Sequence, residues 1–253
     1  MQSDPIQPVS PSGVLVLDKP LGATSRAMCT LVRTRLRRGG APKRVKVGHA
    51  GTLDPLATGV LVILVGRCTR LCDSLMAGQK RYLTTIDLGH VSKSHDLELE
   101  PEEVPVERVP TTDDIERACS AMVGVISQTP PMHSAIKING RRAYQLARKG
   151  DEPKMQPRPV RIDSIDVLGY DFPRLRLDIR CGKGVYIRSL ARDLGVALGV
   201  GGMLHELRRT LVAPFAIERA VRAEDLPEAM GQGDLIAVDL SPPGPDALPG
   251  SPR

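Results

Sequence analysis

The sequence predicts an α+β fold with a central mixed, mainly antiparallel sheet flanked by helices and loops. Apolar runs of strand length and amphipathic helical segments follow one another in irregular order, without an internal repeat. Hydrophobic residues make up 41% of the 253 residues, which is typical of a globular chain. The chain has four Tyr, two Phe and no Trp, so its core must be built from Leu, Val, Ile and Ala.

Five segments have the composition of strands, because they are rich in Val, Ile and Leu and are bounded by Gly or other turn residues. The run 60–65 is apolar throughout, which predicts a strand that is buried on both faces. The last two segments are expected to pair as an antiparallel hairpin. In order, the expected strands are 14–17, 60–65, 81–88, 160–170 and 175–181.

Helices are expected where apolar residues recur every three or four positions. The first can be capped by Thr24 or Ser25 and ends at Gly39 and Gly40. Thr111 can cap another helix, whose first turn carries acidic residues that suit the helix dipole. After the first, the expected helices cover 69–76, 113–123, 141–149, 186–198 and 204–209.

Charge is segregated along the chain, whose formal net charge is +6. Residues 19–53 contain nine Lys and Arg and no acidic residue, whereas 96–116 contain nine Asp and Glu. Such segregation favours an oriented phosphate-binding surface over a generally solvated one. The scarcity of aromatic rings excludes a broad platform for stacking single-stranded bases.

Compartment and metal content are constrained by what the sequence lacks. The longest apolar run, 60–65, is too short to span a bilayer, and residues 1–13 lack the apolar core of a secretory signal. Cys68 and Cys72 could share a helix face, but no partner pair follows at zinc spacing. We therefore expect a cytoplasmic protein with reduced cysteines and no metal site.

The segment 48–59, GHAGTLDPLATG, is the strongest candidate for chemistry. Its three glycines allow close backbone approach, and Pro55 keeps Asp54 in an extended conformation. A carboxylate is thereby presented at the start of a buried strand. The alternative is a plain Asp-Pro turn, but the segment directly follows the densest basic run.

This segment is part of a series of motifs that resembles the bacterial tRNA pseudouridine-55 synthases, the TruB family. The resemblance covers roughly residues 13–220, in order and at family-like spacing. The matching blocks are LDKP (17–20), GHAGTLDPLATGVL (48–61), KRY (80–82), QTPPMHSAIK (128–137), CGKGVYIRSL (181–190) and LRR (207–209).

The resemblance implies the pseudouridine synthase fold and the isomerisation of a T-loop uridine of tRNA, without metal or cofactor. It places the catalytic carboxylate at Asp54 and pairs it with Arg188, which would keep the carboxyl pKa low. Tyr82 would stack on the target base and accept the C5 proton. As alternatives, Tyr82 could be an ordinary packing residue, and a non-catalytic RNA chaperone could have kept the fold.

Substrate-binding positions are also implied by the resemblance. His49 would wedge into the T-loop, Tyr186 would pack against the base or the catalytic arginine, and Leu207 would line the pocket. Asp96 would lie in the strand after the catalytic tyrosine, near the flipped nucleotide. Lys19 belongs to the opening motif, where organising that motif against the Asp54 segment is the favoured alternative to substrate contact.

Three departures from the family pattern bear on RNA binding. Residues 92–96, SKSHD, replace the usual Thr-x-Thr-x-Asp followed by Gly, and His133 replaces a Tyr. Only 32 residues follow Val221, too few for the C-terminal PUA domain of many relatives. RNA contacts would then fall to the basic stretches 26–46 and 141–161.

The expected organisation is a catalytic domain over 13–240 between a disordered N-terminal segment, 1–12, and a disordered Pro/Gly-rich tail, 241–253, without a PUA domain. The expected partner is the T-arm stem-loop of tRNA. We expect a monomer that needs no protein partner. A guide-RNA-dependent synthase is the second alternative, and the short C-terminus argues against it.

Overall fold

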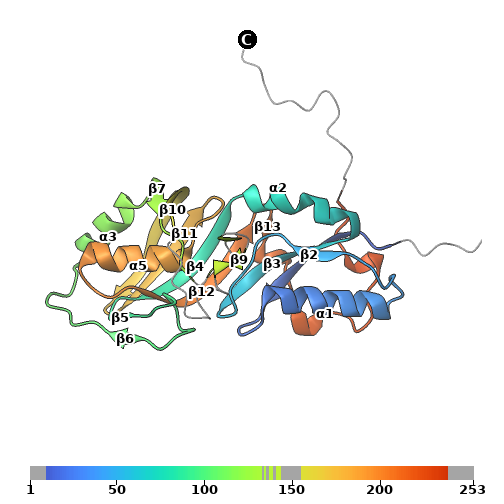
Figure 1. The fold of residues 1–253 in the computed structure, drawn as a ribbon, viewed down its shortest axis with the longest axis horizontal. Coiled ribbons are helices and arrows are strands. Elements are labelled where there is room, and N and C mark those ends of the chain that lie inside the picture. Colours follow the sequence, from blue (N-terminus) through green and yellow to red (C-terminus); the bar gives the residue numbers. More distant parts are fainter. Residues whose placement is uncertain (1–9, 133, 135–136, 139–140, 144–154, 239–253) are drawn as a thin grey trace, which may run out of the picture.

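A computed structural model describes residues 10–132, 134, 137–138, 141–143 and 155–238. One ten-stranded mixed sheet dominates it, in the order β14-β1-β3-β12-β4-β11-β10-β7, with β2 paired to β3 and β13 to β12. The pairs β1–β14 and β3–β12 are parallel, and the other pairs of this sheet are antiparallel. The predicted α+β class with a mainly antiparallel sheet is confirmed (Figure 1).

All five expected segments are strands, and only the segment 81–88 extends past the observed strand, by one residue, because β4 ends at Asp87. Short ladders, β5–β6 and β8–β9, lie outside the main sheet. The strands are β1 (Gly13–Lys19), β2 (Val47–His49), β3 (Ala57–Val65), β4 (Lys80–Asp87), β5 (His90–Val91), β6 (Glu102–Glu103), β7 (Gly124–Gln128), β8 (Lys137–Ile138), β9 (Arg141–Arg142), β10 (Arg158–Asp171), β11 (Arg174–Cys181), β12 (Met203–Val212), β13 (Phe215–Ala216) and β14 (Val221–Arg222).

The helix caps are those that the sequence predicts. The Thr24 side chain accepts from the backbone N–H of Ala27 at the start of α1, and Thr111 forms a reciprocal capping box with Asp114 on α3. The expected helix at 69–76 divides into a 3₁₀ turn and α2. The helices are α1 (Ser25–Arg38), α2 (Cys72–Ala77), α3 (Thr112–Ala121) and α5 (Ile187–Leu198), with 3₁₀ turns at Gly66–Leu71, Ile217–Arg219, Ala223–Asp225 and Gln232–Asp234.

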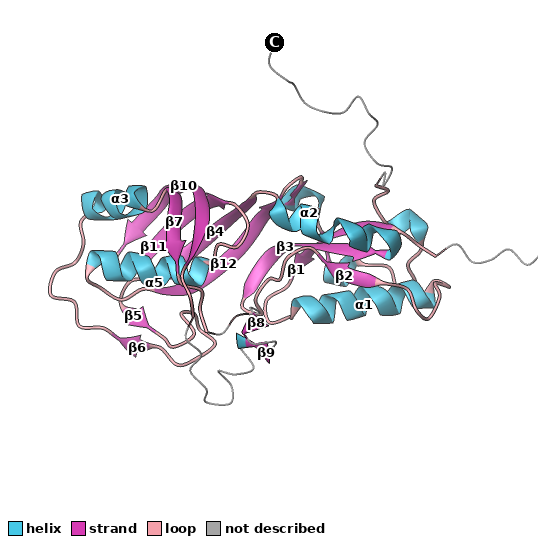
Figure 2. Cartoon of the chain, turned by 45° about the horizontal axis from the view of Figure 1, so that its top comes forward, coloured by secondary structure: helices cyan, strands magenta, loops and turns pink. Residues whose placement is uncertain are grey.

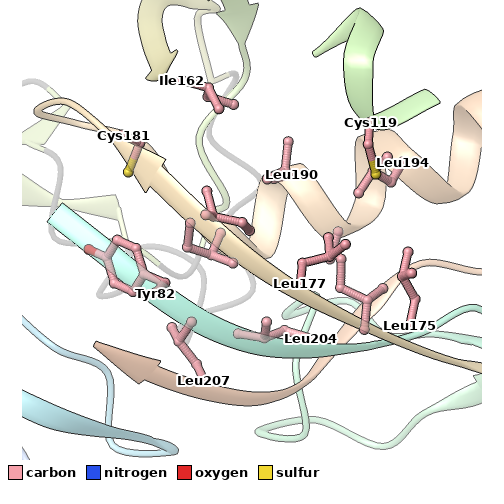
Figure 3. Packing of buried hydrophobic residues seen from close by; sticks show 14 of the residues in the cluster. Tyr82, Cys119, Ile162, Leu175, Leu177, Cys181, Leu190, Leu194, Leu204 and Leu207 are labelled. Carbon is pink, nitrogen blue, oxygen red and sulfur yellow. The ribbon is translucent and has the colours of Figure 1, made fainter. Parts of the chain in front are cut away.

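The molecule is elongated and has two halves, which Figures 1 and 2 show side by side. In the α1 half (β1–β3, α1 and α2), helices cover both faces of the sheet, and β3 contributes to a separate apolar cluster on each face. In the α5 half (β4, β7, β10, β11, α3 and α5), one large cluster lies between the sheet and the two helices (Figure 3). Strand β12 joins the halves, because it pairs with both β3 and β4.

One expected helix is wrong, and another is wrong at its first two residues. Residues 204–209 belong to strand β12, whose register against β4 shifts at two β-bulges, between Leu204 and Glu206 and between Arg209 and Leu211. A bulge inserts an extra residue into one strand, so Leu204 and Leu207 both reach the core although they are three apart. A spacing of three residues between core positions is also typical of an amphipathic helix. In the expected helix over 141–149, Arg141–Arg142 form β9 instead, Ala143 is helical, and residues 144–149 lie outside the described residues.

The expected disordered tail, 241–253, and the His133 departure also lie outside the described residues, as do residues 1–9 of the N-terminal segment. Ser12, at the end of that segment, contacts the folded chain: its backbone N donates to Gln232 Oε1 at 2.9 Å, and the Gln232 amide donates to its carbonyl at 3.0 Å.

Candidate active site

Asp54 lies on a loop, residues 51–55, that is hydrogen-bonded at nearly every residue; we call it the Asp54 loop. Ser25, at the start of α1, both donates to the Leu53 carbonyl and accepts from the Leu53 N–H, each at 2.9 Å. The Lys19 ammonium donates to the Pro55 carbonyl at 3.2 Å. Leu53 itself is buried in the large cluster of the α5 half. The loop is therefore fixed to both halves before any substrate binds.

The other side of the Asp54 loop rests on Arg209 of β12. This buried guanidinium donates to the carbonyls of Gly51 and Thr52, at 3.1 and 3.2 Å, and its Nε donates to the Val60 carbonyl of β3 at 2.8 Å. Loop and strand are thus held by one side chain. No role is expected for Arg209 from the sequence, although Arg209 is the last residue of the Leu-Arg-Arg block at 207–209.

The loop presents the Asp54 carboxylate to Arg188, the second residue of α5. Arg188 Nε lies 3.0 Å from Asp54 Oδ2, and Arg188 Nη1 lies 3.4 Å from Asp96 Oδ2 and donates to the Ser94 carbonyl at 3.1 Å. The side chains of Arg188 and Asp96 are 4% and 6% exposed, whereas that of Asp54 is 37% exposed. One buried guanidinium therefore joins two carboxylates, of which only Asp54 faces outward.

The electrostatic balance at Asp54 differs from the predicted one. Arg188 lowers the carboxyl pKa, as expected, but burial outweighs it and raises the pKa above its ordinary value. The nearby charges of Asp96 and Glu98 raise the pKa further. The expectation of a low pKa is therefore wrong. Arg188 reduces the rise in the Asp54 pKa that burial in the surrounding protein causes.

Tyr82 lies on β4, directly across from Arg209 of β12. Its side chain is 8% exposed and belongs to the large cluster, where Figure 3 shows it near Leu207. Burial raises the pKa of the Tyr82 hydroxyl, while the nearby positive charge of Arg209 opposes the rise. The structure thus brings Tyr82 and Leu207 together at one end of the apolar core.

Asp96 is not in a strand, contrary to the expectation, but in the turn that follows β5. The hydroxyl of Ser92 donates to the Asp96 carbonyl at 2.6 Å, and Asp96 Oδ1 accepts from the Glu98 N–H at 2.9 Å. His95 has a positive φ of 60°, and burial lowers its pKa to about 4. The small hydroxyl residues of the altered segment thus still hold the turn that positions Asp96.

Tyr186 is the N-cap of α5 rather than its first helical residue. Its backbone N–H donates to Gln128 Oε1 at 2.8 Å, and the Gln128 amide donates to its carbonyl at 3.2 Å. The Arg158 guanidinium lies 5.4 Å from the centre of the Tyr186 ring. The arginine found over this ring is Arg158, which the sequence alone does not single out.

The last two expected site residues differ in exposure. His49 is the half-buried end of β2, opposite Ile63 of β3. Lys19 is fully buried and donates to the carbonyls of Pro20 and Ala23, at 2.9 and 2.7 Å, as well as to the Asp54 loop. Burial lowers its pKa to about 8. These contacts favour the structural alternative for Lys19 over substrate contact.

The basic segment before the Asp54 loop is partly neutralised. Arg35 and Arg38 of α1 pair with Glu228, from the 3₁₀-rich segment that returns beside β1. Arg33 donates to the Val47 carbonyl at 3.0 Å. The exposed cations of this segment include Arg26, Lys43, Arg44 and Lys46.

Comparison with known proteins decides the family. A family profile described as "TruB family pseudouridylate synthase (N terminal domain)" matches residues 38–187, and one described as "tRNA pseudouridylate synthase B C-terminal domain" matches 188–237. The chain belongs to the TruB family. Proteins named tRNA pseudouridine synthase B from Phocaeicola vulgatus and Mycobacteroides abscessus are 41% and 43% identical to this TruB-family chain. The alignments cover 89% and 92% of this chain and 96% and 76% of those proteins.

Solved structures agree with the family assignment. The chain superposes on one in a Cbf5-Nop10-Gar1 complex with a TM-score of 0.63 and 30% identity, over 85% of this chain and 53% of that one. A chain of an H/ACA RNP bound to a substrate RNA containing 2′-deoxyuridine gives a TM-score of 0.59 and 28% identity, over 85% and 52%. This TruB-family chain thus spans about half the length of those solved chains.

The described residues also bear on two other features, a metal site and a membrane-spanning helix. No group of three or more His, Cys, Asp or Glu side chains is arranged to hold a metal ion within the part of the chain that the structure describes. Across the same residues, no helix combines the length and the apolar character needed to cross a membrane.

Proposed function

We propose that this chain converts the uridine at position 55 of tRNA to pseudouridine, through Asp54. Its family domains and the named relatives make it a tRNA pseudouridine synthase, which is an isomerase. The observation that supports the roles of individual residues is the pair of Asp54 and Arg188: a partly exposed carboxylate on a fully bonded loop, 3.0 Å from a buried guanidinium.

The reaction requires the ionised form of Asp54. The carboxylate either adds to C1′ of the nucleotide or assists formation of a glycal, and in both cases the N1–C1′ bond breaks. The uracil then rotates and forms the C5–C1′ bond. C5 loses its proton and N1 gains one, so the product is an isomer of the substrate. Arg188 would stabilise the carboxylate against the burial that raises its pKa.

Tyr82 is proposed to stack on the rotating base and to accept the C5 proton. Its position at the end of the apolar cluster, next to Leu207, supports this role, because a flipped base needs an apolar wall as well as a polar one. Tyr186 with Arg158 would form a second wall. His49, at the end of β2, would occupy the place in the T-loop that the flipped nucleotide leaves.

The proposed substrate is the T-arm stem-loop, and the exposed cations Arg26, Lys43, Arg44 and Lys46 would contact its phosphates. We propose that a single copy of the chain acts without a protein partner, in the cytoplasm. The structural neighbours that belong to complexes argue for testing this directly, by measuring the activity of the purified chain alone.

The test is the Asp54→Asn variant with an unmodified tRNA transcript that carries tritium at C5 of its uridines. We expect tritium release to fall by about 10⁴-fold or more while tRNA affinity is kept. Asp225→Asn is the matched control, because Asp225 is also paired with an arginine, at 2.8 Å, but lies in an exposed 3₁₀ turn. Continued release by Asp54→Asn would contradict the catalytic assignment. A wild-type protein that binds tRNA and releases no tritium would indicate an RNA chaperone.

A further inference from the structure

Arg209 is an unusual residue for the middle of a sheet. Its side chain is 2% exposed, and its backbone lies opposite Gly59 of β3 on one side and Tyr82 of β4 on the other. Arg209 takes no part in the ion pairs found among the described residues. Burying a guanidinium without a carboxylate is costly, so its contacts must serve some purpose.

Those contacts go to the segments that carry the proposed catalytic residues. The two terminal nitrogens donate to the carbonyls of Gly51 and Thr52 in the Asp54 loop, and Arg209 lies directly opposite Tyr82 in the sheet. Nε donates to the Val60 carbonyl, so the side chain is fixed to β3 at the same time. One planar group therefore sets the position of the loop relative to the tyrosine.

The strands are shaped to place this side chain. A Cβ on Gly59 would come within 2.2 Å of the Arg209 carbonyl oxygen, so β12 can lie against β3 here only because residue 59 is glycine. The β-bulge between Arg209 and Leu211 then changes the direction of the strand. The preceding residue, Arg208, pairs instead with Asp18, at 2.7 Å.

We infer that Arg209 is a positioning residue for the isomerisation, which clamps the Asp54 loop to β3 beside Tyr82. This inference rests on the proposed function for its catalytic part. The clamp depends on the shape of the group, because a planar fork with several N–H donors can reach three carbonyls at once. A lysine would keep the charge but could not span the same acceptors.

The Arg209→Lys variant keeps the positive charge but loses the planar group that makes the three contacts. Arg208→Lys is the matched control, since it makes the same change at the adjacent residue of the strand. We expect single-turnover pseudouridine formation by Arg209→Lys to be about 100-fold slower than wild type, the cost of a displacement of about 1 Å between reacting groups. Because phosphate contacts are untouched, we expect the tRNA dissociation constant to change by less than about threefold. The control should keep the wild-type rate.

Hydrogen exchange provides a readout that does not depend on activity. In Arg209→Lys, amides of the Asp54 loop should exchange faster, while amides of α3 and β10, far from the clamp, should keep their protection. Faster exchange throughout the chain would instead indicate a general loss of stability and would overturn the inference. A wild-type rate with unchanged loop exchange would also overturn it.

The two proposals can fail separately. If the wild-type protein released no tritium from tRNA, the proposed function would be wrong, yet selective loosening of the Asp54 loop in Arg209→Lys would still support the clamp. If Asp54→Asn abolished activity while Arg209→Lys matched Arg208→Lys in rate and exchange, the proposed function would stand and the clamp would be wrong.

Discussion

The α1 half and the α5 half of this molecule bury the same sheet in different ways. In the α1 half, β3 is apolar on both faces and packs against α1 on one side and α2 on the other. In the α5 half, α3 and α5 cover one face, and the other face leaves Leu83 and Leu168 partly exposed. Strands buried on both faces are the harder to deform, which makes the α1 half the firmer support.

The candidate active site combines residues from the two halves. The Asp54 loop leads into β3 and is bonded to Ser25 and Lys19, all in the α1 half, whereas its ion-pair partner Arg188 comes from α5. Arg209, on the strand between the halves, contacts the loop and Tyr82. A carboxylate held by the firmer half thus meets an arginine from the other half, and three comparisons can test that view.

The largest expected effect is on stability. Leu61 of β3 is 0% exposed, and we expect Leu61→Ala to lower the free energy of unfolding by about 3 kcal/mol, because truncation leaves a cavity between packed layers. Leu83 of β4 is 36% exposed, and Leu83→Ala should cost less than about 1 kcal/mol. Urea unfolding followed by circular dichroism measures both. Equal losses would mean that the open face of the α5 half is covered in solution.

A smaller effect is expected at the anchor of the loop. Ser25→Ala removes one hydroxyl that bonds both polar groups of the Leu53 backbone, in a buried place. We expect a loss of about 2 kcal/mol in stability, with a slower single-turnover rate. Thr30→Ala removes a hydroxyl that bonds the Arg26 carbonyl on the exposed side of the same helix, and it should cost less than about 0.5 kcal/mol. A full wild-type rate in Ser25→Ala would show that Arg209 and Lys19 suffice.

The smallest expected effect is a shift in the pH dependence. The proposed reaction needs ionised Asp54, so we expect its rate to fall as pH falls through the raised carboxyl pKa of the folded protein. Asp96 adds to that rise through its negative charge. In Asp96→Asn we therefore expect the acid limb of the single-turnover rate profile to move to lower pH, because the carboxylate would stay ionised further into acid. Asp225→Asn is the control, and a shift to higher pH would show that Asp96 acts mainly by orienting Arg188.

The pKa of Asp54 depends on more than the sequence motif that contains it. The pairing of Asp54 with Arg188 follows from the family resemblance, and so does the lowering effect of the arginine. The net direction of the Asp54 pKa does not, because it is dominated by burial, and burial depends on every segment that surrounds the loop. A sequence motif indicates which residues pair, but it does not indicate how far the pair is removed from water.

Strand β12 shows the same limit for the fold. Leu204 and Leu207 are spaced as on a helix, and local spacing therefore favours a helix over 204–209. Two bulges against β4 allow the same spacing in a strand. Bulges depend on the partner strand and are invisible in the segment itself. The expected helix over 204–209 also gave no reason to assign Arg209 a role. Gly59 and Tyr82 become neighbours of Arg209 only when residue 209 lies in the sheet.

The sequence by itself determined the elements whose signals are local: the apolar strand β3, the capped helices α1 and α3, and a stiff loop that presents Asp54. Short-range backbone and capping preferences decide such features within a few residues. Only the tertiary structure decided that Arg188 lies between Asp54 and Asp96, that Arg209 holds the loop, and that burial raises the carboxyl pKa. These depend on contacts between residues up to 158 positions apart, which are made by strand order and packing rather than by local preference.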